Sequence, residues 1–462
     1  MPENIRVKGT WWSPEQPDRK LPGELTYSPT GGAELDLFGH FFETSDDSVL
    51  RRPFTVFGAT VRGRLVTLFD CHTRNLTTHL PGGKSAQITS YFGVVGGHFA
   101  TRSAMKFCRV TARFTDLAEW TATTGIRVQL DPPTYTTTFT FRVPDAVSLG
   151  EKDGVQMKLD FTGAATSHGF HRYEFSEDCT VVLETDHLAP YVDFEGLLGK
   201  LQYFISLGVG RPVYRTVVVA RLDQPKYVVE ETPVFEEFEF IRKVNLPARP
   251  ENDLLAMEMQ FTLAVLQPRP ADVVSTYLEK YAKLVPVCEL YFTMLYNQDM
   301  PTRQKFLSLA HAVEAYHRAF IGGKYMPDDE YERDVKPVFV QAIPALLDPD
   351  FNSSLKNRFK YLHEFSLRKQ LQDVCSRFED LLRKFCGDPK SFGIKVAEAR
   401  NRLTHSDANA PCELDWKELW ILSEQVALVL SVCLLHELGF AADRIHATLN
   451  NNPHARAILL NR

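Results

Sequence analysis

The pattern Arg-x-x-x-x-His pairs a permanent positive charge with a side chain that exchanges protons near neutral pH. Such a pair can carry out acid–base chemistry on an anionic group, because the imidazole moves a proton while the guanidinium stabilises negative charge. The chain contains the pattern three times, at Arg74/His79, Arg358/His363 and Arg400/His405. The surrounding sequence therefore has to distinguish the three.

Arg400/His405 has the most favourable context. Residues 395–405 predict a helix whose apolar stripe leaves Arg400 and Asn401 on another face. His405 precedes Ser-Asp-Ala-Asn-Ala-Pro, which is typical of a helix end, so its ring can turn back towards Arg400. The alternative is a histidine placed favourably beside the free carbonyls of a helix C-terminus.

Arg74/His79 lies in a β-like region before a Pro-Gly-Gly turn, and we predict a solvated loop there. Cys71, His72 and His79 are close together in the sequence, but no second ligand pair follows at zinc-like spacing. We therefore predict no metal site.

Arg358/His363 is predicted to lie in the middle of a helix, where the two side chains are about 140° apart around the helix axis.

The segment from Phe351 to Arg402 contains 12 Lys+Arg and 6 Asp+Glu, a net charge of +6. Clustered cations suit phosphate-backbone binding, with solvated bundle faces as the alternative.

The patterning of the chain changes near residue 250. Alternating runs rich in Thr, Val and Phe come first and predict an antiparallel, sandwich-like β region with one helical insertion at 193–207. Apolar residues then recur at helical spacing, which predicts an all-α bundle. The fold class is therefore α+β, with domains at 1–246 and 300–462 and a connector with leading helices at 247–299.

Seven helices are predicted in the second half. Pro286 should kink or split the first, and Pro301 suits the first turn of the second. Their predicted ranges are 272–296, 301–320, 328–347, 353–385, 393–405, 413–438 and 441–449.

Composition limits the class of protein. The 462 residues carry 52 Lys+Arg and 58 Asp+Glu, and a net charge of −6 argues against whole-surface nucleic-acid binding but not against a local basic face. The eight cysteines form no C-x-x-C pair, which predicts free thiols in a reducing cytosol. The chain shows no secretory signal, and its most apolar stretch, 426–435, is shorter than a membrane span of about 20 residues. We predict a cytoplasmic protein that does not bind a membrane.

Several segments resemble ApeA-type anti-phage defence proteins with a C-terminal HEPN ribonuclease domain. Arg400-Asn401-x-x-x-His405 resembles the Arg-(Asn/Asp/His)-x-x-x-His motif of HEPN ribonucleases, and the segment 306–318 resembles their helix with an embedded glutamate, here Glu314. Residues 361–371 and 434–440 resemble the ApeA-type branch. Segments 9–14, 23–25 and 66–71 resemble its β-rich N-terminal domain.

The resemblance implies a metal-independent endoribonuclease that acts in abortive infection without a cofactor. His405 would take the proton of the RNA 2′-OH or protonate the leaving 5′-oxygen, and Arg400 would stabilise the negative charge of the phosphorane. Asn401 would orient either the phosphate or the imidazole by hydrogen bonds. The products would carry 2′,3′-cyclic phosphate and 5′-OH ends. The resemblance also implies a homodimer or higher homo-oligomer, an RNA substrate with tRNA as an example, and a phage-derived trigger sensed by the N-terminal domain. Glu314 is expected either to take part in the site or to form an ion pair with Arg318, which lies four residues later on the same helix surface.

Three cations are candidates for RNA binding: Lys395, Arg402 and Arg358. Two other functions stay open from the sequence. The helical half could be a non-catalytic HEPN module that binds RNA or nucleotide, or one that only dimerises beside a ligand-binding β-sandwich. The aromatic residues Trp11, Trp12 and Tyr27 suit either a ligand site or a core.

Overall fold

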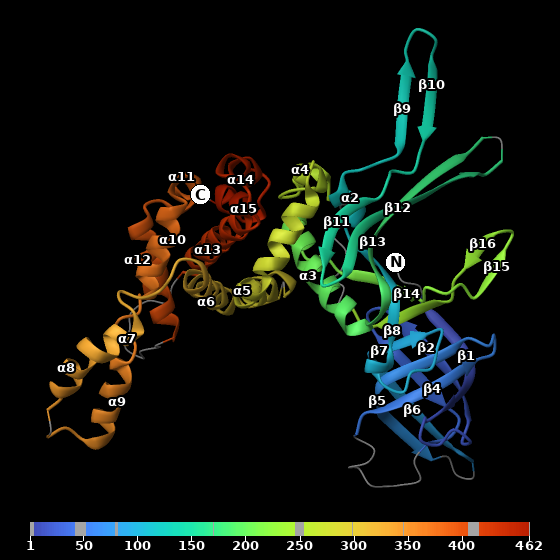
Figure 1. The fold of residues 1–462 in the computed structure, drawn as a ribbon, viewed down its shortest axis with the longest axis horizontal. Coiled ribbons are helices and arrows are strands. Elements are labelled where there is room, and N and C mark those ends of the chain that lie inside the picture. The colour runs from blue at the N-terminus through green and yellow to red at the C-terminus, as the bar shows by residue number, and fades with distance from the viewer. Residues whose placement is uncertain are drawn as a thin grey trace. The chain divides into compact units, whose positions relative to one another are not determined.

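The computed structural model describes residues 4–41, 52–78, 82–169, 171–244, 254–297, 299–344, 346–404 and 415–461. The chain divides into two compact units, which are described separately (Figure 1). Unit 1 is Met1–Val209 with Val213–Ser275, and unit 2 is Gly210–Pro212 with Thr276–Arg462. Unit 1 is β-rich and antiparallel and unit 2 is helical, so the predicted α+β class is confirmed.

Six antiparallel strands of unit 1 close into a barrel in the order β5-β4-β1-β2-β3-β6, with β6 pairing back to β5. The barrel takes the place of the expected sandwich because the 14-residue β5 pairs with β4 and β7 along its first half and with β6 along its second. The bounds are β1 Ile5–Trp12, β2 Leu21–Ser28, β3 Gly32–Leu37, β4 Phe54–Thr60, β5 Leu65–Thr78 and β6 Lys84–Ser90.

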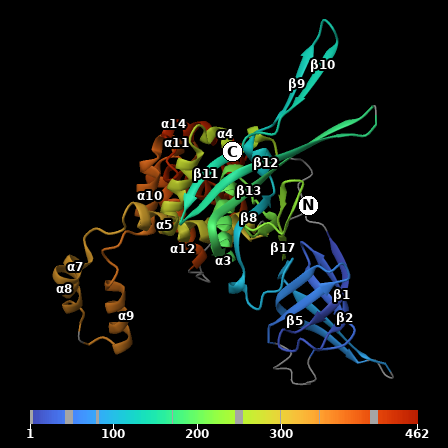
Figure 2. The same ribbon diagram turned by 45° about the vertical axis from the view of Figure 1, so that its right-hand side comes forward.

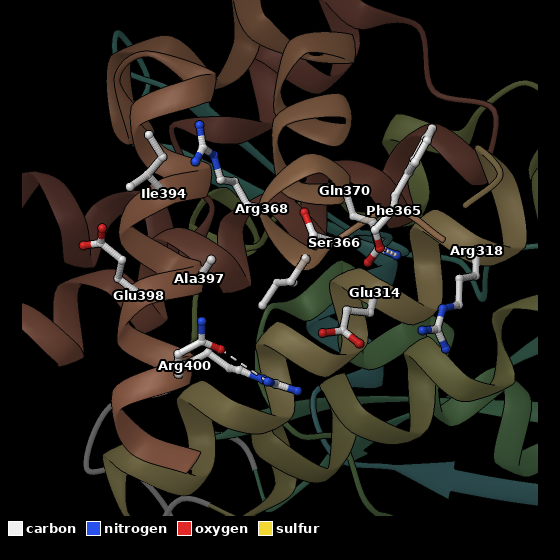
Figure 3. A pocket seen from close by; sticks show the side chains of 12 residues that line it. Glu314, Arg318, Phe365, Ser366, Arg368, Gln370, Ile394, Ala397, Glu398 and Arg400 are labelled. Carbon is white, nitrogen blue, oxygen red and sulfur yellow. Dashed lines mark hydrogen bonds between the residues drawn. The ribbon is translucent and has the colours of Figure 1, made fainter. Parts of the chain in front are cut away.

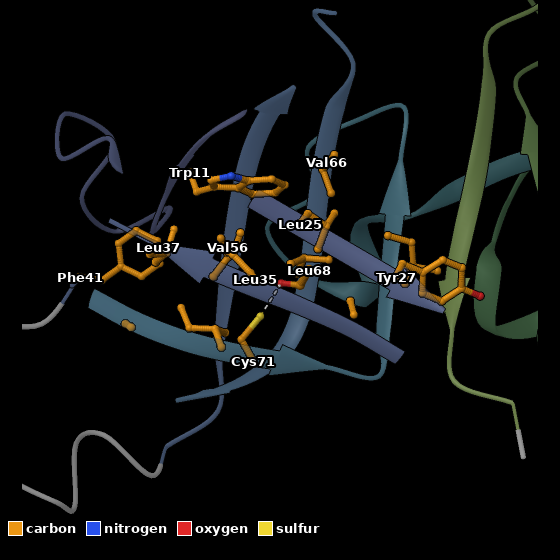
Figure 4. Close-up of a cluster of buried hydrophobic side chains, with 14 of the residues drawn as sticks. Trp11, Leu25, Tyr27, Leu35, Leu37, Phe41, Val56, Val66, Leu68 and Cys71 are labelled. Carbon is orange, nitrogen blue, oxygen red and sulfur yellow. Dashed lines mark hydrogen bonds between the residues drawn. The ribbon is translucent and has the colours of Figure 1, made fainter. Parts of the chain in front are cut away.

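The barrel interior is filled by apolar side chains that alternate along the strands (Figure 4). Trp11 is fully buried, and its indole occupies the space beside Gly58, where a Cβ would lie 2.2 Å from the ring. Tyr27 is also buried and donates a hydrogen bond to the carbonyl of Arg242 (3.0 Å). These two aromatic residues are therefore core residues, which removes them from the candidate ligand site.

The sheet continues from β5 beyond the barrel, and the helix α3 (Tyr191–Val209) contacts β8 and β13. The predicted helical insertion is thus confirmed. The continuing strands are β7 Phe92–Val95, β17 Glu237–Arg242, β14 Arg215–Arg221, β8 Lys106–Phe114, β13 Tyr173–Pro190, β12 Val155–Ser167 and β11 Val147–Lys152. Two further hairpins are β9 Ile126–Asp131 with β10 Thr136–Phe141, and β15 Tyr227–Val229 with β16 Thr232–Val234. The short helices of unit 1 are η1 Arg102–Ala104, α2 Leu117–Thr121, η2 Ala256–Glu258 and α4 Leu263–Leu266.

Unit 2 is a bundle around α13 (Trp416–Glu437), which packs against α6, α11, α14 and α15. The other helices are α5 Pro270–Tyr296 (which begins in unit 1), α6 Thr302–Phe320, α7 Asp328–Glu330, the π-helix η3 Tyr331–Val335, α8 Lys336–Gln341, α9 Pro349–Phe359, α10 Leu367–Arg377, α11 Glu379–Cys386, α12 Pro389–Thr404, α14 Ala442–Leu449 and α15 Pro453–Leu460. The elements α7, α8 and α9 come between α6 and α10 in the chain, and Figures 1 and 2 both show them projecting away from the other helices of unit 2.

Of the two outcomes predicted for Pro286, a kink or a split, the structure excludes the split: α5 continues through it, and Leu284 and Val287 on either side are buried. Two other helix predictions need correction. The segment 353–385 is not one helix: α9 ends at Phe359, and Ser366 starts α10 as an N-cap. The segment 328–347 is likewise divided into α7, η3 and α8, and α15 was not predicted.

α13 is apolar and long enough to cross a membrane by length and composition, but 72% of its apolar window is buried within the structure. Its buried carboxylates, Glu424 and Glu437, form ion pairs with Lys305 and Lys280 of neighbouring helices. These features fit a helix buried in the core of the bundle, as predicted for 426–435. Seven cysteines lie in the described part of the chain, and all are free thiols.

Candidate active site

A cavity of about 560 Å³ lies between α6, α10 and α12 in unit 2 (Figure 3). Three residues predicted for the site line it together: Glu314 from α6, and Arg400 and Asn401 from α12. The remaining charged and polar lining residues are Arg318, Ser366, Arg368, Gln370 and Glu398, and the apolar ones are Phe365, Leu367, Ile394 and Ala397.

The buried stripe of α12 fixes the direction of Arg400 and Asn401. Val396 and Ala399 are buried in the bundle, so Arg400 is left half-buried at the cavity wall. Its Nη1 donates to Oδ1 of Asn401 at 3.4 Å, a weak contact, and among the described residues the other guanidinium donors have no hydrogen-bond acceptor. Thr404 closes the last turn by donating to the carbonyl of Arg400 (2.9 Å).

Glu314 points into the cavity from the opposite helix (Figure 3). The alternative partner, Arg318, instead forms its ion pair with Glu364 at 3.6 Å. Glu314 has no hydrogen bond or ion pair with a residue in the described part of the chain. The buried neighbours Ala312 and Val313 hold this part of α6 against the bundle and leave the Glu314 carboxylate free to meet a ligand.

His405 lies outside the described residues, and so does His79. In the sequence, His405 directly follows Thr404, the last residue of α12. The structure therefore places the arginine and asparagine of the predicted motif and the embedded glutamate, and it leaves the position of the histidine open.

The predicted RNA-binding cations do not line this cavity. Lys395 and Arg402 are both exposed on α12. They are seven residues apart, which places them within about 20° of each other around the helix axis, whereas Arg400 lies about 140° around the axis from Lys395. Lys395 and Arg402 therefore share a face of the helix that differs from the face of Arg400. Arg358 lies on α9 and borders a separate open hollow with Asp350 and Tyr361.

The other two Arg-x-x-x-x-His patterns differ from their predicted settings. Arg74 lies in strand β5 rather than a loop, and it pairs with Glu34 on the outer barrel wall (3.3 Å). His363 follows the end of α9 instead of lying mid-helix. Its Nε2 lies 2.6 Å from Oδ1 of Asp328, which ties together the two ends of the α7–α9 projection.

Cys71 and His72 occupy opposite faces of β5, the thiol in the barrel core and the imidazole outside. Burial raises the pKa of the Cys71 thiol well above its ordinary value, so the thiolate that a metal needs is disfavoured. Among the described residues, no group of three or more His, Cys, Asp or Glu side chains could hold a metal ion.

Sequence reasoning missed Arg368 and Gln370 of α10 and Glu398 of α12 as cavity residues, and it treated Arg318 only as a partner of Glu314. A signal for Arg368 existed in the basic stretch that ends at Arg402. With three arginines and two glutamates, the lining carries a net charge of +1, which suits an anion. His317 behind the cavity is fully buried, and this burial lowers its pKa despite the nearby Asp373, so it is a neutral structural residue.

A β-barrel with a continuing sheet, followed by a helical bundle that gathers Glu314, Arg400 and Asn401 at one cavity, defines a protein with a β-rich domain and a helical domain. The family model for ApeA N-terminal domain 1 matches residues 6–267, and the model for Apea-like HEPN matches residues 307–444. The chain therefore belongs to the ApeA family, with an ApeA N-terminal domain and a C-terminal HEPN domain. No match to it was found among curated proteins or among solved structures. HEPN domains are generally of the ribonuclease type, and the two domains together support a nuclease-related role in anti-phage defence.

Proposed function

We propose that the protein is a metal-independent endoribonuclease of an abortive-infection system. One observation carries the proposal: α6 and α12 bring Glu314, Arg400 and Asn401 to a single cavity, and the motif histidine, His405, comes next in the sequence after α12. This is the residue set that acid–base cleavage of a phosphodiester needs, a cation for charge and a group that exchanges protons at neutral pH.

In the proposed reaction, the RNA 2′-oxygen attacks the adjacent phosphorus and displaces the 5′-oxygen of the next nucleotide. The reaction removes the 2′-OH proton and adds a proton to the leaving 5′-oxygen. His405 carries out one of these two transfers, and solvent water carries out the other. Arg400 donates hydrogen bonds to the phosphorane oxygens. The Asn401 amide orients either the phosphate or the His405 imidazole by hydrogen bonds. Glu314 positions the ribose or the imidazole. The products carry a 2′,3′-cyclic phosphate and a 5′-hydroxyl.

The proposed biological setting follows the family. We propose that the N-terminal domain senses a phage-derived trigger, that the substrate includes tRNA, and that the protein acts in the cytoplasm as a homodimer or larger homo-oligomer. Within the described ranges, α13 is the helix long and apolar enough to span a membrane, and its burial and its buried ion pairs support a soluble protein.

The test measures cleavage of total RNA and tRNA by purified protein with EDTA present. We expect Arg400→Ala and His405→Ala to lower the rate by about 10²-fold or more, since each removes an acid–base or charge-stabilising group. We expect Asn401→Ala and Glu314→Gln to have smaller effects. Mapping of the fragment ends should give cyclic phosphates.

Arg74→Ala and His79→Ala are matched controls, because the pattern Arg74-Asn75-x-x-x-His79 repeats the motif in unit 1. Both should leave cleavage unchanged. Full activity in His405→Ala would contradict the proposal, and loss of activity with EDTA would contradict the metal-free mechanism. Salt-dependent RNA binding without cleavage by the wild-type protein would instead support a non-catalytic RNA-binding HEPN module.

A further inference from the structure

Arg368 and Arg400 lie at different ends of the cavity, on different helices (Figure 3). Arg368 is in the first turn of α10, is exposed, and has no ion pair with any acidic residue in the described ranges. The two side chains point in different directions in Figure 3, an arrangement that suits contacts with consecutive phosphates of one strand better than with a single shared phosphate.

The backbone at Arg368 is held close to α12 by Gly393. A Cβ at position 393 would lie 2.8 Å from the carbonyl oxygen of Arg368, so only glycine allows this helix crossing without a shift. The crossing fixes the first turn of α10 beside the helix that carries Arg400. The spacing of the two arginines is therefore set by backbone packing rather than by loops.

Two further features of α10 face a ligand at this wall. The first backbone N–H groups of a helix have no partner within the helix and favour an anion, and the first turn of α10 lines the cavity. Gln370 also lines it with its side chain buried: Nε2 donates to the carbonyl of Phe365 (3.1 Å), while Oε1 has no described partner.

We propose that Arg368 is a second phosphate-binding residue: it holds the phosphodiester next to the one that Arg400 contacts, so the cavity takes a two-phosphate stretch of single-stranded RNA. This inference rests on the proposed function, because it places the scissile phosphate at Arg400. The volume of about 560 Å³ falls in the range of ligand pockets and leaves room for the nucleotide between the two phosphates. Glu314 and Glu398 of the same lining oppose a third phosphate.

The experiment combines a protein variant with a change in the substrate. The substrates are oligonucleotides with one ribonucleotide in a DNA strand, made with either normal phosphates or neutral methylphosphonates at the linkages next to the cleavable one. With normal phosphates, Arg368→Ala should lower kcat/KM about tenfold or more, the usual effect of losing a charge-assisted hydrogen bond. With the neutral linkages, wild-type and Arg368→Ala proteins should cleave equally slowly.

Arg383→Ala is the control variant, since Arg383 is an exposed arginine of the neighbouring α11 that already pairs with Glu379; it should behave as wild type on both substrates. Equal losses for Arg368→Ala on both substrates would show a structural role and overturn the inference, as would no loss on either. RNA binding to the Arg400→Ala protein separates this inference from the proposed function. In the Arg400→Ala background, we measure how the RNA-binding constant falls with salt concentration. Adding Arg368→Ala should make the slope of log K against log salt shallower by the amount expected for one lost phosphate contact, whether or not cleavage is ever seen. An unchanged slope overturns the inference.

Discussion

At the scale of single residues, Glu424 of α13 is a buried charge held by partners from several helices. Its carboxylate accepts from Lys305 of α6 (2.5 Å) and lies 2.8 Å from Nδ1 of His454 in α15, whose other ring nitrogen meets Tyr291 of α5 (3.2 Å). Burial raises the pKa of Glu424, but the hydrogen bonds and charges of His454 and Lys305 outweigh burial and lower it to about 2. One carboxylate thereby ties four helices together.

This pairing makes stability depend on pH. Because the pKa of Glu424 in the folded protein lies below its ordinary 4.5, its contribution is complete above that pH and is lost as the pH falls towards 2. The shift corresponds to about 3 kcal/mol. We expect Glu424→Gln to lower the thermal midpoint of the helical circular-dichroism signal strongly at pH 7 and much less near pH 3.

Glu418→Gln is the matched control, because Glu418 is exposed on the same helix. It should leave the midpoint nearly unchanged at both pH values. A Glu424→Gln deficit of the same size at pH 3 and pH 7 would contradict the assigned ionic role.

Two residues of the candidate site were accessible from the sequence. Arg400 and Asn401 are neighbours within one helix, and the helical period alone places them off the buried stripe. Glu314 required the resemblance. Arg368 and Gln370 could not be predicted, because their place at the cavity depends on how α10 crosses α12. That crossing is a property of two helices, and no spacing within either one encodes it.

At the scale of elements, Gly393 is the residue that decides this crossing. We expect Gly393→Ala to destabilise the protein by about 1–3 kcal/mol, because overpacking against the α10 backbone outweighs the gain of about 1 kcal/mol in helix propensity. The measurement is the thermal midpoint. RNA cleavage should also fall, since Arg368 and Arg400 would move apart.

Gly196 of α3 provides the opposite case, a helical glycine with no atom within 4 Å of the added Cβ. Gly196→Ala should raise the thermal midpoint of unit 1 through helix propensity alone, by up to about 1 kcal/mol in stability. If Gly393→Ala were equally stabilising, the close crossing of α10 and α12 would not exist in solution.

The elements themselves were largely predictable, and the errors have local causes. The period of apolar residues located α6, α12, α13 and α14 to within a few residues. The boundaries inside 353–385 were missed because the basic, helix-favouring composition continues through the break, where the cap at Ser366 and the non-helical backbone of Phe378 (φ −117°, ψ 28°) interrupt the helix. Closure of the barrel was also out of reach, since it depends on one strand changing partners halfway along.

At the scale of the whole molecule, the net charge of −6 conceals how the charges are used. The segment after Arg402 is acidic in sequence, yet two of its carboxylates, Glu424 and Glu437, are buried and paired with lysines. They stabilise the bundle rather than repel RNA from its surface. The charge that would bear on the proposed RNA substrate is instead the local excess of arginine at the α6–α10–α12 cavity.

The proposed homodimer has a consequence that cleavage by single variants does not test. If the arginine of one protomer acts with the histidine of its partner, mixing inactive Arg400→Ala and His405→Ala proteins creates one intact site in each mixed dimer. Random exchange of subunits makes about half of all dimers mixed, and each mixed dimer has one intact site of two, so activity should recover to about a quarter of the wild-type value.

The measurement mixes the two purified variants, unfolds them mildly and refolds them together, and sedimentation establishes that dimers form. Each variant refolded alone is the control. Dimers that stay inactive on mixing would show that each site is built within a single chain, and in that case the cavity of one protomer would have to supply every group of the reaction.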